Sequence, residues 1–386
     1  MNLHMPQPLT TTSLATPIAV QTPRLIEFGA GVAPTAGRWA REQKLARILV
    51  VADTFNAKRV DALALKGEVM VFGELTAEPD VPLLDAGLAL ARRFKPDLVI
   101  GFGGGSAMDL AKLIATLGTS SQVLQDVVGA EKISAKTSIL MHVPTTSGTG
   151  SEAGTRALLI DPVTQNKLAV QSRHMLADIA IIDPALTLTL PPTITATTGV
   201  DAMAHCVEAF TNKKSHPFID MYALEGIRLV GRYLARAVKD GSDIEARAGL
   251  SLASLYGGFC LGPVNTSAGH AVAYPLGTRH HVPHGAANAL IFPHTLAFNA
   301  SVVPDKTTAV LAALGCKPTS NADEVRALAH RYCSDLGCEM RLSALKVARE
   351  DLPIMASEAH AIRRLLDNNP REISRGQILA LYEEAY

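Results

Sequence analysis

Four side chains in the second half of the sequence could together bind a metal ion. They are Asp201, His205, His270 and His284. Asp201 and His205 are four positions apart, so on a helix both side chains lie on one face, one turn apart. One carboxylate and three imidazoles form a nitrogen and oxygen ligand set that suits a divalent transition metal. The alternative is a set of unrelated polar residues on helix surfaces, because a single Asp-x-x-x-His spacing also arises by chance.

A run of glycines, Gly103 to Gly105, is followed by Ser106 and could bind a phosphate group. It lies between an apolar run typical of a buried strand and a segment with helical spacing. Glycines let backbone N–H groups approach a phosphate closely, and a helix N-terminus favours negative charge. The alternative is a plain tight turn, and the glycine order is not the G-x-G-x-x-G pattern. We expect phosphate binding, because three glycines exceed what a turn needs.

Two further segments end apolar runs and carry polar side chains. Asp53 ends the run 46–53, where a carboxylate can hydrogen-bond a ribose diol and would repel a 2′-phosphate, which favours NAD over NADP. The alternative is that Asp53 caps the next helix. The loop 145–151, TTSGTGS, could bind a pyrophosphate or a carboxamide, or it could be a solvated loop.

The elements that must position these residues alternate in the first half of the chain. Predicted strands at 46–53, 97–106, 138–146 and 179–184 alternate with predicted helices at 81–94 and 107–117, which indicates a parallel sheet covered on both faces. Segments 156–162 and 165–172 are the expected arms of a hairpin. After the two prolines at 191–192 only helical segments follow. We therefore expect a loose leader (1–22), an α/β domain (23–190) and an all-helical domain (191–386).

The composition excludes several classes of protein. Lys+Arg and Asp+Glu both total 36 in the 386 residues, so no basic excess indicates binding to nucleic acid or to a membrane surface. No apolar run is long enough to span a membrane, and the N-terminus lacks the pattern of a signal peptide. The five cysteines are an odd number without metal-site spacing, which indicates reduced thiols in a cytoplasmic protein.

Four motifs in this order and spacing resemble those of the iron-containing (group III) alcohol dehydrogenases. They are GGGSAMDLAK, PTTSGTGSE, GVDAMAHCVEA, and GHAVAYPLG with VPHGAANA. The resemblance covers residue 23 to the C-terminus. It implies an α/β dinucleotide-binding domain with a parallel sheet and an all-α metal-binding domain, as in the dehydroquinate synthase-like architecture. It also implies NAD, Fe²⁺ with Zn²⁺ as the alternative, a small-molecule substrate and a homodimer or larger homo-oligomer.

The resemblance also assigns roles to single residues. The implied metal ligands are Asp201, His205, His270 and His284. The implied cofactor-binding residues are Gly104, Gly105 and Ser106 with Asp109 for the pyrophosphate, Asp53 for the adenosine ribose, Thr145 and Thr146, Lys167, and Leu186 near the nicotinamide. By the usual order of affinities this ligand set binds Zn²⁺ more tightly than Fe²⁺, so iron rests on the resemblance.

Two positions depart from the family pattern. Tyr274 stands where many members have a second His that is proposed as a proton relay, and a Tyr with an ordinary pKa of about 10 is a poorer relay at pH 7. Water, the cofactor ribose or another His are the alternative routes. Arg156 lies near the expected substrate, and Arg279 precedes the last metal ligand. Either Arg could recognise an anionic substrate, and surface placement is the alternative for both.

The expected reaction is metal-assisted hydride transfer between NAD(H) and a small alcohol, aldehyde, hydroxy or oxo substrate. One alternative is the NADH-dependent reduction of an anionic oxoacid, as in maleylacetate reductases, which often lack a metal. Another is a non-redox lyase similar to dehydroquinate synthase, which uses NAD transiently. A catalytically silent metal- or nucleotide-binding module is the third. The complete set of candidate ligands argues against all three.

Overall fold

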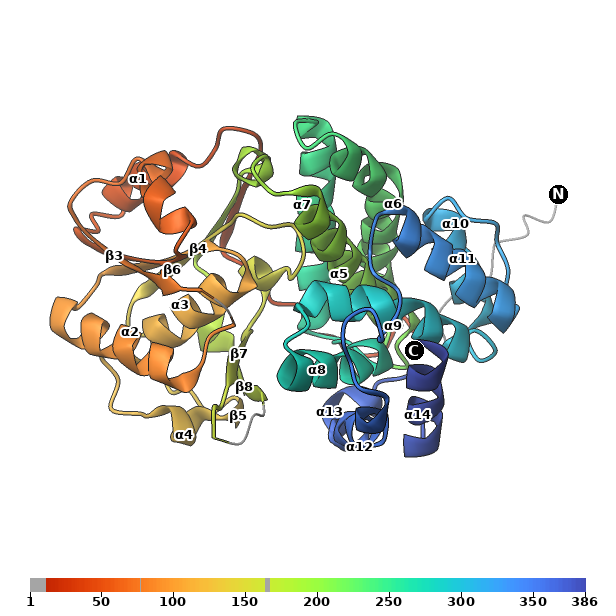
Figure 1. The fold of residues 1–386 in the computed structure, drawn as a ribbon. Coiled ribbons are helices and arrows are strands. Elements are labelled where there is room, and N and C mark those ends of the chain that lie inside the picture. Colours follow the sequence, from red (N-terminus) through yellow and green to blue (C-terminus); the bar gives the residue numbers. More distant parts are fainter. Residues whose placement is uncertain (1–11, 77, 164–166) are drawn as a thin grey trace.

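The computed structural model describes residues 12–386 except residue 77 and residues 164–166. An α/β domain and a helical domain lie side by side (Figure 1). The first half of the predicted leader, residues 1–11, lies outside the described residues. Residues 17–23 have no regular secondary structure, and Ile18 and Val20 pack against the core of the helical domain. These contacts bind the start of the described chain to the domain that is distant from it in sequence.

The α/β domain is built on a six-stranded sheet in which neighbouring strands are parallel. In spatial order the strands are β1 (Leu25–Phe28), β9 (Ile179–Ile182), β6 (Ile139–Pro144), β4 (Leu98–Gly103), β2 (Arg47–Asp53) and β3 (Glu68–Leu75). The four inner strands are apolar along most of their length, because both faces of the sheet are covered. Gly103 pairs with Pro144, so the glycine run and the loop after β6 leave the same edge of the sheet.

Alternate residues of β2 enter two different hydrophobic cores, one on each face of the sheet. Leu49 and Val51 enter the first core, and Ile48 and Val50 enter the second. The helices over the first face are α2 (Val81–Phe94) and α3 (Gly105–Leu117), and those over the second are α1 (Thr35–Glu42) and the 3₁₀ helix η1 (Asn56–Leu63). This two-sided burial explains why β2 is a continuous apolar run.

A second, smaller sheet lies beside α3. Its strands, in spatial order, are β5 (Gly129–Ala130), β8 (Lys167–Gln171) and β7 (Arg156–Ile160). β7 and β8 are antiparallel, which confirms the predicted hairpin, although part of its turn lies outside the described residues. Arg156 pairs with Gln171 at the end of the hairpin away from the turn. This pairing places both side chains at the domain boundary.

From residue 191 onward the described chain contains helices and loops and no strand. The longer helices are α5 (Pro192–Thr211), α6 (Pro217–Lys239), α7 (Ile244–Leu261), α8 (Ala268–His280), α9 (His284–Asn299), α10 (Pro304–Ala313), α11 (Ala322–Asp335), α12 (Leu352–Ala361) and α14 (Arg375–Glu384). The shorter helical elements of the described residues are α4 (Leu124–Val127), η2 (Ser151–Ala153), η3 (Arg173–Met175), η4 (Pro184–Thr187), η5 (Arg349–Asp351) and α13 (Arg363–Leu366).

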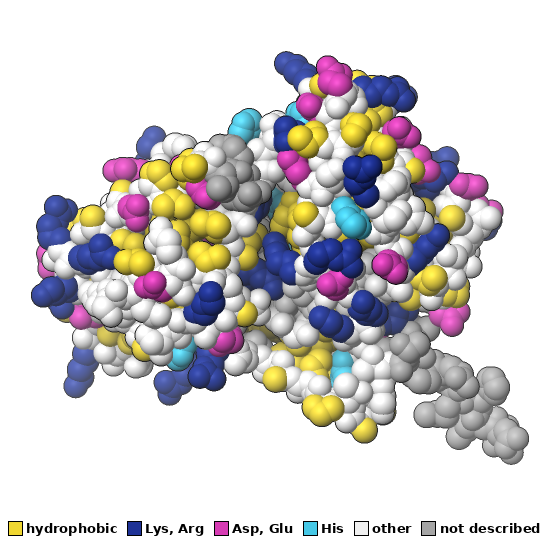
Figure 2. All heavy atoms as spheres, turned by 90° about the horizontal axis from the view of Figure 1, so that it is seen from below, with side chains coloured by type: hydrophobic (Ala, Val, Ile, Leu, Met, Phe, Trp, Pro, Cys, Tyr) yellow, Lys and Arg dark blue, Asp and Glu magenta, His cyan; other side chains and the backbone are white. Residues whose placement is uncertain are grey.

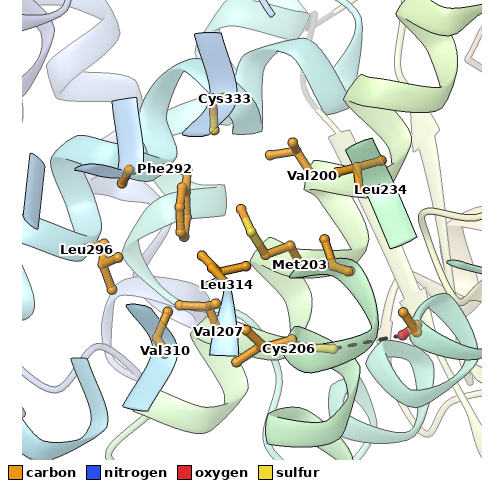
Figure 3. Packing of buried hydrophobic residues seen from close by; sticks show 14 of the residues in the cluster. Val200, Met203, Cys206, Val207, Leu234, Phe292, Leu296, Val310, Leu314 and Cys333 are labelled. Atoms are coloured by element: carbon orange, nitrogen blue, oxygen red, sulfur yellow. Dashed lines mark hydrogen bonds between the residues drawn. The ribbon is translucent and has the colours of Figure 1, made fainter. Parts of the chain in front are cut away.

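Helix α5 is the centre of the helical core. Every residue from 199 to 211 is buried, which is unusual for a helix of a two-layered protein and requires cover on all sides. Met203 and Val207 of α5 pack with Phe292 of α9 and with Leu314, which follows α10 (Figure 3). A polar face on such a helix must therefore find its partners inside the protein.

The loop 145–151 after β6 connects the two domains. Ser147 Oγ lies 3.0 Å from Ser251 Oγ of α7. Gly150 has a φ of +61° and meets Gly258 of α7 backbone to backbone: a Cβ added at Gly258 would lie 2.4 Å from the Gly150 oxygen. Only glycine fits this contact, so the loop is fixed directly against α7.

The structure confirms the predicted fold class and the strands and helices named from the sequence. It adds β3, the short strand β5 beside the hairpin and the helix α1. No helix among the described residues is long and apolar enough to cross a membrane.

Candidate active site

The four predicted metal ligands come together at one point of the helical domain. Asp201 and His205 lie on α5, His270 in the first turn of α8 and His284 at the start of α9. Asp201 Oδ1 lies 3.6 Å from His270 Nε2 and 3.5 Å from His284 Nε2. The distance from Asp201 Oδ1 to His205 Nε2 is 3.9 Å. One ligand atom from each of the four residues lies within 4.8 Å of the others.

Two of the histidines are oriented by partners on their outer nitrogen. His270 Nδ1 lies 2.5 Å from Glu208 Oε1, and His205 Nδ1 lies 3.3 Å from the Gly148 oxygen. These partners turn both Nε2 atoms toward Asp201, as in histidine metal ligands whose other ring nitrogen donates to a carboxylate or a carbonyl. Glu208 is buried and also accepts from the backbone N–H of Ser267 at 2.6 Å.

The charge states of Asp201 and His284 suit a cation, whereas His270 must first lose a proton. Burial raises the pKa of Asp201, but the neighbouring His205 and His284 outweigh this and hold it far below its usual range. Burial lowers the pKa of His284 to about 4, so that ring is neutral at pH 7. Against the effect of burial, Glu208 and Asp201 raise the pKa of His270 to about 10. Metal binding would therefore release a proton from His270.

The Asn288 side chain shows that the four candidate ligands surround a place suited to a cation. Its Nδ2 lies 2.7 Å from Asp201 Oδ1, while its own Oδ1 is buried without a hydrogen-bond partner. The same Nδ2 lies 3.1 Å from His270 Nε2 and 3.2 Å from His284 Nε2. Once His270 has lost its proton, these three atoms are all acceptors that converge on one electropositive group. The donor set fits a divalent metal, which would replace the Asn288 amide as their common partner.

The glycine run lies at the N-terminus of α3, with Gly104 as the residue before the helix. A Cβ at Gly105 would lie 2.7 Å from Thr149 Cγ2, and one at Gly104 would lie 3.3 Å from Thr146 Oγ1. The loop 145–151 therefore covers this helix end closely. Backbone N–H groups at such a helix end can bind a pyrophosphate.

Asp109 lines the same pocket as Gly105 and Ser106, and its carboxylate is bound by neighbouring protein groups. Its Oδ1 accepts from Ser151 Oγ at 2.6 Å and from Lys112 Nζ at 3.2 Å, and its Oδ2 accepts from the Leu158 N–H at 3.0 Å. Lys112 is buried and also donates to the Arg156 oxygen at 2.8 Å. In the structure Asp109 therefore connects α3, the loop 145–151 and the hairpin, and its predicted contact with the cofactor stays a prediction.

Asp53 caps the start of η1, as the alternative interpretation of the sequence predicted. Its Oδ1 accepts from the N–H groups of Phe55 at 3.0 Å and Asn56 at 2.8 Å. Asn56 Nδ2 donates to Asp53 Oδ2 at 2.6 Å and to Thr145 Oγ1 at 3.1 Å. The carboxylate lies beside the glycine run, because a Cβ at Gly103 would be 2.9 Å from Asp53 Oδ2. Its predicted contact with a ribose stays a prediction, as does the nicotinamide contact of the buried Leu186.

A pocket of about 210 Å³ joins the two sites. Its lining includes residues of the glycine run, the hairpin and the metal cluster, which are Gly105, Ser106, Arg156, Lys167, His270 and His284. Tyr274 also lines it, with its ring centroid 5.9 Å from that of His284. Lys167 Nζ lies 2.8 Å from Glu78 Oε2 and 5.2 Å from the centre of the Tyr274 ring. The pocket therefore connects the expected phosphate site to the metal cluster.

The two candidate arginines have different positions. Arg156 lines the pocket, whereas Arg279 pairs with Glu358 at the surface and is not part of the lining. Sequence analysis missed Glu208, Asn288 and Arg364. Glu208 follows His205 by three residues, which on a helix is a signal for a shared face. Arg364 meets Tyr274 only through the tertiary fold.

Comparisons with known proteins agree with this geometry. Residues 23–184 match the family described as iron-containing alcohol dehydrogenase, and residues 195–386 match the C-terminal part of the Fe-containing alcohol dehydrogenase family. Long-chain-alcohol dehydrogenase 1 of Geobacillus thermodenitrificans is 35% identical over 327 residues, 82% of each chain.

Two solved structures show the same fold. A 1,3-propanediol oxidoreductase is 30% identical, with a TM-score of 0.91 over 96% of this chain and 100% of its own. Sulfoacetaldehyde reductase from Bifidobacterium kashiwanohense in complex with NAD⁺ is 28% identical, with a TM-score of 0.87 over 96% of this chain and 99% of its own. This chain belongs to the iron-containing alcohol dehydrogenase family and is an NAD-dependent oxidoreductase that uses a divalent metal.

Proposed function

We propose that this enzyme interconverts a small primary alcohol and its aldehyde with NAD(H), at the pocket between the glycine run and the metal cluster. The observation that carries this proposal is that one pocket is lined both by the N-terminus of α3 and by three of the four candidate metal ligands. The proposed metal ligands are Asp201, His205, His270 and His284. The proposed metal is Fe²⁺, and Zn²⁺ is the alternative because it binds such ligands more tightly.

When bound, the metal supplies Lewis acidity toward the substrate oxygen, and NAD(H) supplies the hydride acceptor or donor. The protein's own contribution is position and the exclusion of water. The backbone of Gly104, Gly105 and Ser106 holds the pyrophosphate, and Thr145 and Thr146 hold the cofactor from the loop on the other side. Asp109 acts through that loop, which it fixes by its bond to Ser151.

Three side chains are proposed to act near the reacting atoms. Lys167, held by Glu78, lines the pocket on the proposed cofactor side, and the buried Leu186 would contact the nicotinamide. Tyr274 is buried next to the metal cluster, and the guanidinium of Arg364 stacks on its ring. Its hydroxyl is proposed to hold the exchanging proton, with water and the cofactor ribose as the other route.

Asp53 is proposed to select NAD over NADP. Its carboxylate lies beside the glycine run, and a negative charge there repels a 2′-phosphate. Its capping bonds to the η1 backbone fix this carboxylate in place, so capping and recognition are compatible.

The test of the proposed function is net NADH production. The enzyme is loaded anaerobically with Fe²⁺ and assayed with NAD⁺ on a panel of primary alcohols and diols, with His284→Ala as the matched control. We expect NADH with the wild type and none with the control. NAD⁺-dependent turnover of a substrate without net NADH would favour the non-redox lyase. Activity that survives His284→Ala and metal removal would favour a reductase without metal, as in the maleylacetate-reductase-like alternative.

A homodimer and a cytoplasmic location complete the proposal. Among the described residues no strand pairs with the outer side of the edge strand β1, and Leu25 and Phe28 are exposed on it, so a second copy can extend the sheet. All five cysteines are free in the structure, as expected for a reducing compartment. A single-chain mass by light scattering at micromolar concentration would contradict the dimer.

A further inference from the structure

The charges around the pocket are not balanced. Lys112 pairs with Asp109, and Lys167 pairs with Glu78, so each of these lysines has its own carboxylate. Arg156 also lines the pocket, and within the described residues it forms no ion pair. The guanidinium of Arg156 therefore faces the pocket without an ion pair of its own among the described residues, because the nearby Asp109 is already paired with Lys112.

The guanidinium of Arg156 is held by neutral groups. Nη1 donates to Asn265 Oδ1 at 2.9 Å, and Nη2 donates to Gln171 Oε1 at 2.9 Å. Asn265 adopts a φ of +76°, a left-handed conformation that Asn tolerates better than most residues. A guanidinium has five N–H donors, so three remain after these two bonds. Arg156 is thus oriented by the protein but keeps donors for a ligand.

A second guanidinium, that of Arg364 in the helical domain, lies outside the pocket lining but contacts Tyr274, which lines the pocket. Arg364 of α13 stacks on Tyr274, with its Cζ 5.6 Å from the ring centre, and no ion pair of Arg364 occurs among the described residues. Burial and the positive charge of Arg364 lower the pKa of Arg156, so the two cations influence each other. Arg364 is exposed, so the charge of the partly buried Arg156 is the more costly one to leave without an anion. Lys and Arg side chains gather beside the hollow between the domains on the face seen in Figure 2.

Arg156 shares one cavity with the metal cluster, because Arg156, His270 and His284 all line the pocket of about 210 Å³. Tyr274 also lines it: Arg364 stacks on the Tyr274 ring, and the ring centroid lies 5.9 Å from that of His284 and 6.5 Å from that of His270. A substrate whose oxygen reaches the metal ligands and whose far end reaches Arg156 must fit this cavity, so it is a small molecule.

We propose that the substrate is a short ω-hydroxy acid or its aldehyde, whose carboxylate or sulfonate is bound by Arg156 and Arg364 while its alcohol carbon lies at the metal cluster. This inference rests on the proposed function and narrows its substrate class. Arg156 and Arg364 are specificity residues in this assignment, and neither takes part in hydride transfer.

Neither cofactor binding nor a purely structural role accounts for the arginines as well. The pyrophosphate of NAD belongs at the N-terminus of α3, whereas the Arg156 side chain points to Asn265, next to α8 in the other domain. In a purely structural role we would expect Arg156 to pair with a carboxylate. Both of its hydrogen-bond partners are neutral amides. An oxyanion, in contrast, matches the planar fork of an arginine.

The test compares substrates of similar size that differ in charge. Oxidation of 3-hydroxypropanoate, isethionate and 1-butanol by NAD⁺ is measured on the Fe²⁺-loaded wild type and on Arg156→Leu, Arg156→Lys, Arg364→Leu and Arg279→Leu. We expect kcat/KM of the wild type to be higher for an anion than for 1-butanol. Arg156→Leu should lower kcat/KM for that anion by about 30-fold or more and leave 1-butanol nearly unchanged.

The controls separate charge from structure. Arg156→Lys should restore part of the lost preference, because it keeps the charge without the fork. Arg364→Leu alters an exposed residue, so it tests the anion site even if Arg156→Leu fails to fold. Arg279→Leu should resemble the wild type, since Arg279 pairs with Glu358 outside the pocket. The anion with the higher kcat/KM decides between carboxylate and sulfonate.

The outcomes distinguish this inference from the proposed function. NADH from 1-butanol but from neither anion would refute the inference and leave the proposed function intact, and so would equal losses on both substrate classes in Arg156→Leu. If no alcohol yields NADH, the proposed function fails. In that case, calorimetry measures whether isethionate and 3-hydroxypropanoate bind to the wild type and to Arg156→Leu. Binding to the wild type that is lost in Arg156→Leu supports the anion site. No binding to the wild type, or equal binding to both proteins, refutes it.

Discussion

Replacing Glu208 with glutamine should weaken metal binding more than any change outside the four ligands. Glu208 Oε2 accepts from Ser267 N–H at 2.6 Å and Ser267 Oγ at 3.2 Å, and Oε1 faces His270 Nδ1. In Glu208→Gln the amide oxygen takes the place that faces the Ser267 donors, so the amide NH₂ faces His270 Nδ1. A neutral His270 must then accept at Nδ1 and carry its proton on Nε2, the nitrogen that faces Asp201.

The expected magnitude follows from this change of tautomer. Loss of a hydrogen-bonded partner behind a histidine ligand lowers metal affinity by about 10- to 100-fold. Because the glutamine also stabilises the tautomer that cannot bind, we expect the upper limit, a 100-fold loss or about 2.8 kcal/mol of binding free energy. The assay is competition for Zn²⁺ with a chromophoric chelator, since Zn²⁺ is stable in air.

Glu245→Gln is the matched control. Glu245 lies on α7 and is largely exposed, with Arg236 as its partner at 3.2 Å, so its loss should leave metal affinity unchanged. Circular dichroism shows whether Glu208→Gln folds. A folded Glu208→Gln protein that binds Zn²⁺ within about threefold of the wild type would refute the orienting role of Glu208.

Three further predictions concern the ligands, the cofactor and pH. His270→Ala and His284→Ala should each abolish metal binding and dehydrogenase activity while the fold persists; one tightly held metal per chain in both variants, by elemental analysis, would contradict the ligand set. Asp53→Gly should raise kcat/KM for NADP relative to NAD, and a wild type that uses both cofactors equally would contradict the role of Asp53. Burial raises the pKa of Glu152 from 4.5 to about 7, so its stabilising contribution is complete below pH 4.5 and is lost as pH rises through 7. Glu152→Gln should remove about 3 kcal/mol of this pH dependence, measured as urea unfolding free energy at pH 4.5 and pH 8, and an unchanged dependence would show that Glu152 ionises freely.

The sequence predicts the inner strands of the fold better than its edges. β2 and β4 are buried on both faces, so each is a continuous apolar run that a reader of the sequence can recognise. β3 lies at the edge of the sheet and buries only Phe72 and Leu75, which leaves a weak local signal. Its position depends on pairing with β2, a contact between distant residues that no local pattern encodes.

The same distinction applies to the site. Asp201 and His205 share a helix face, so their spacing alone indicates a common site. The partners that orient or surround them come from other elements: Asn288 from α9, and Arg364 from a helix ninety residues beyond Tyr274. Local patterns therefore identify candidate ligands, whereas charge balance and ligand orientation require the three-dimensional structure.

The contact between Gly150 and Gly258 fixes the width of the active-site cleft. The nucleotide side and the metal side meet here through backbone atoms, with no side chain that can rotate to change the spacing. A methyl group at Gly258 would be about 1 Å short of ordinary contact distance and would wedge the domains apart by a similar amount. Displacement of reacting groups by about 1 Å can cost on the order of a hundredfold in rate. Two glycines without reactive side chains, Gly150 and Gly258, thus set the distance between the hydride donor or acceptor and the metal-bound side of the pocket.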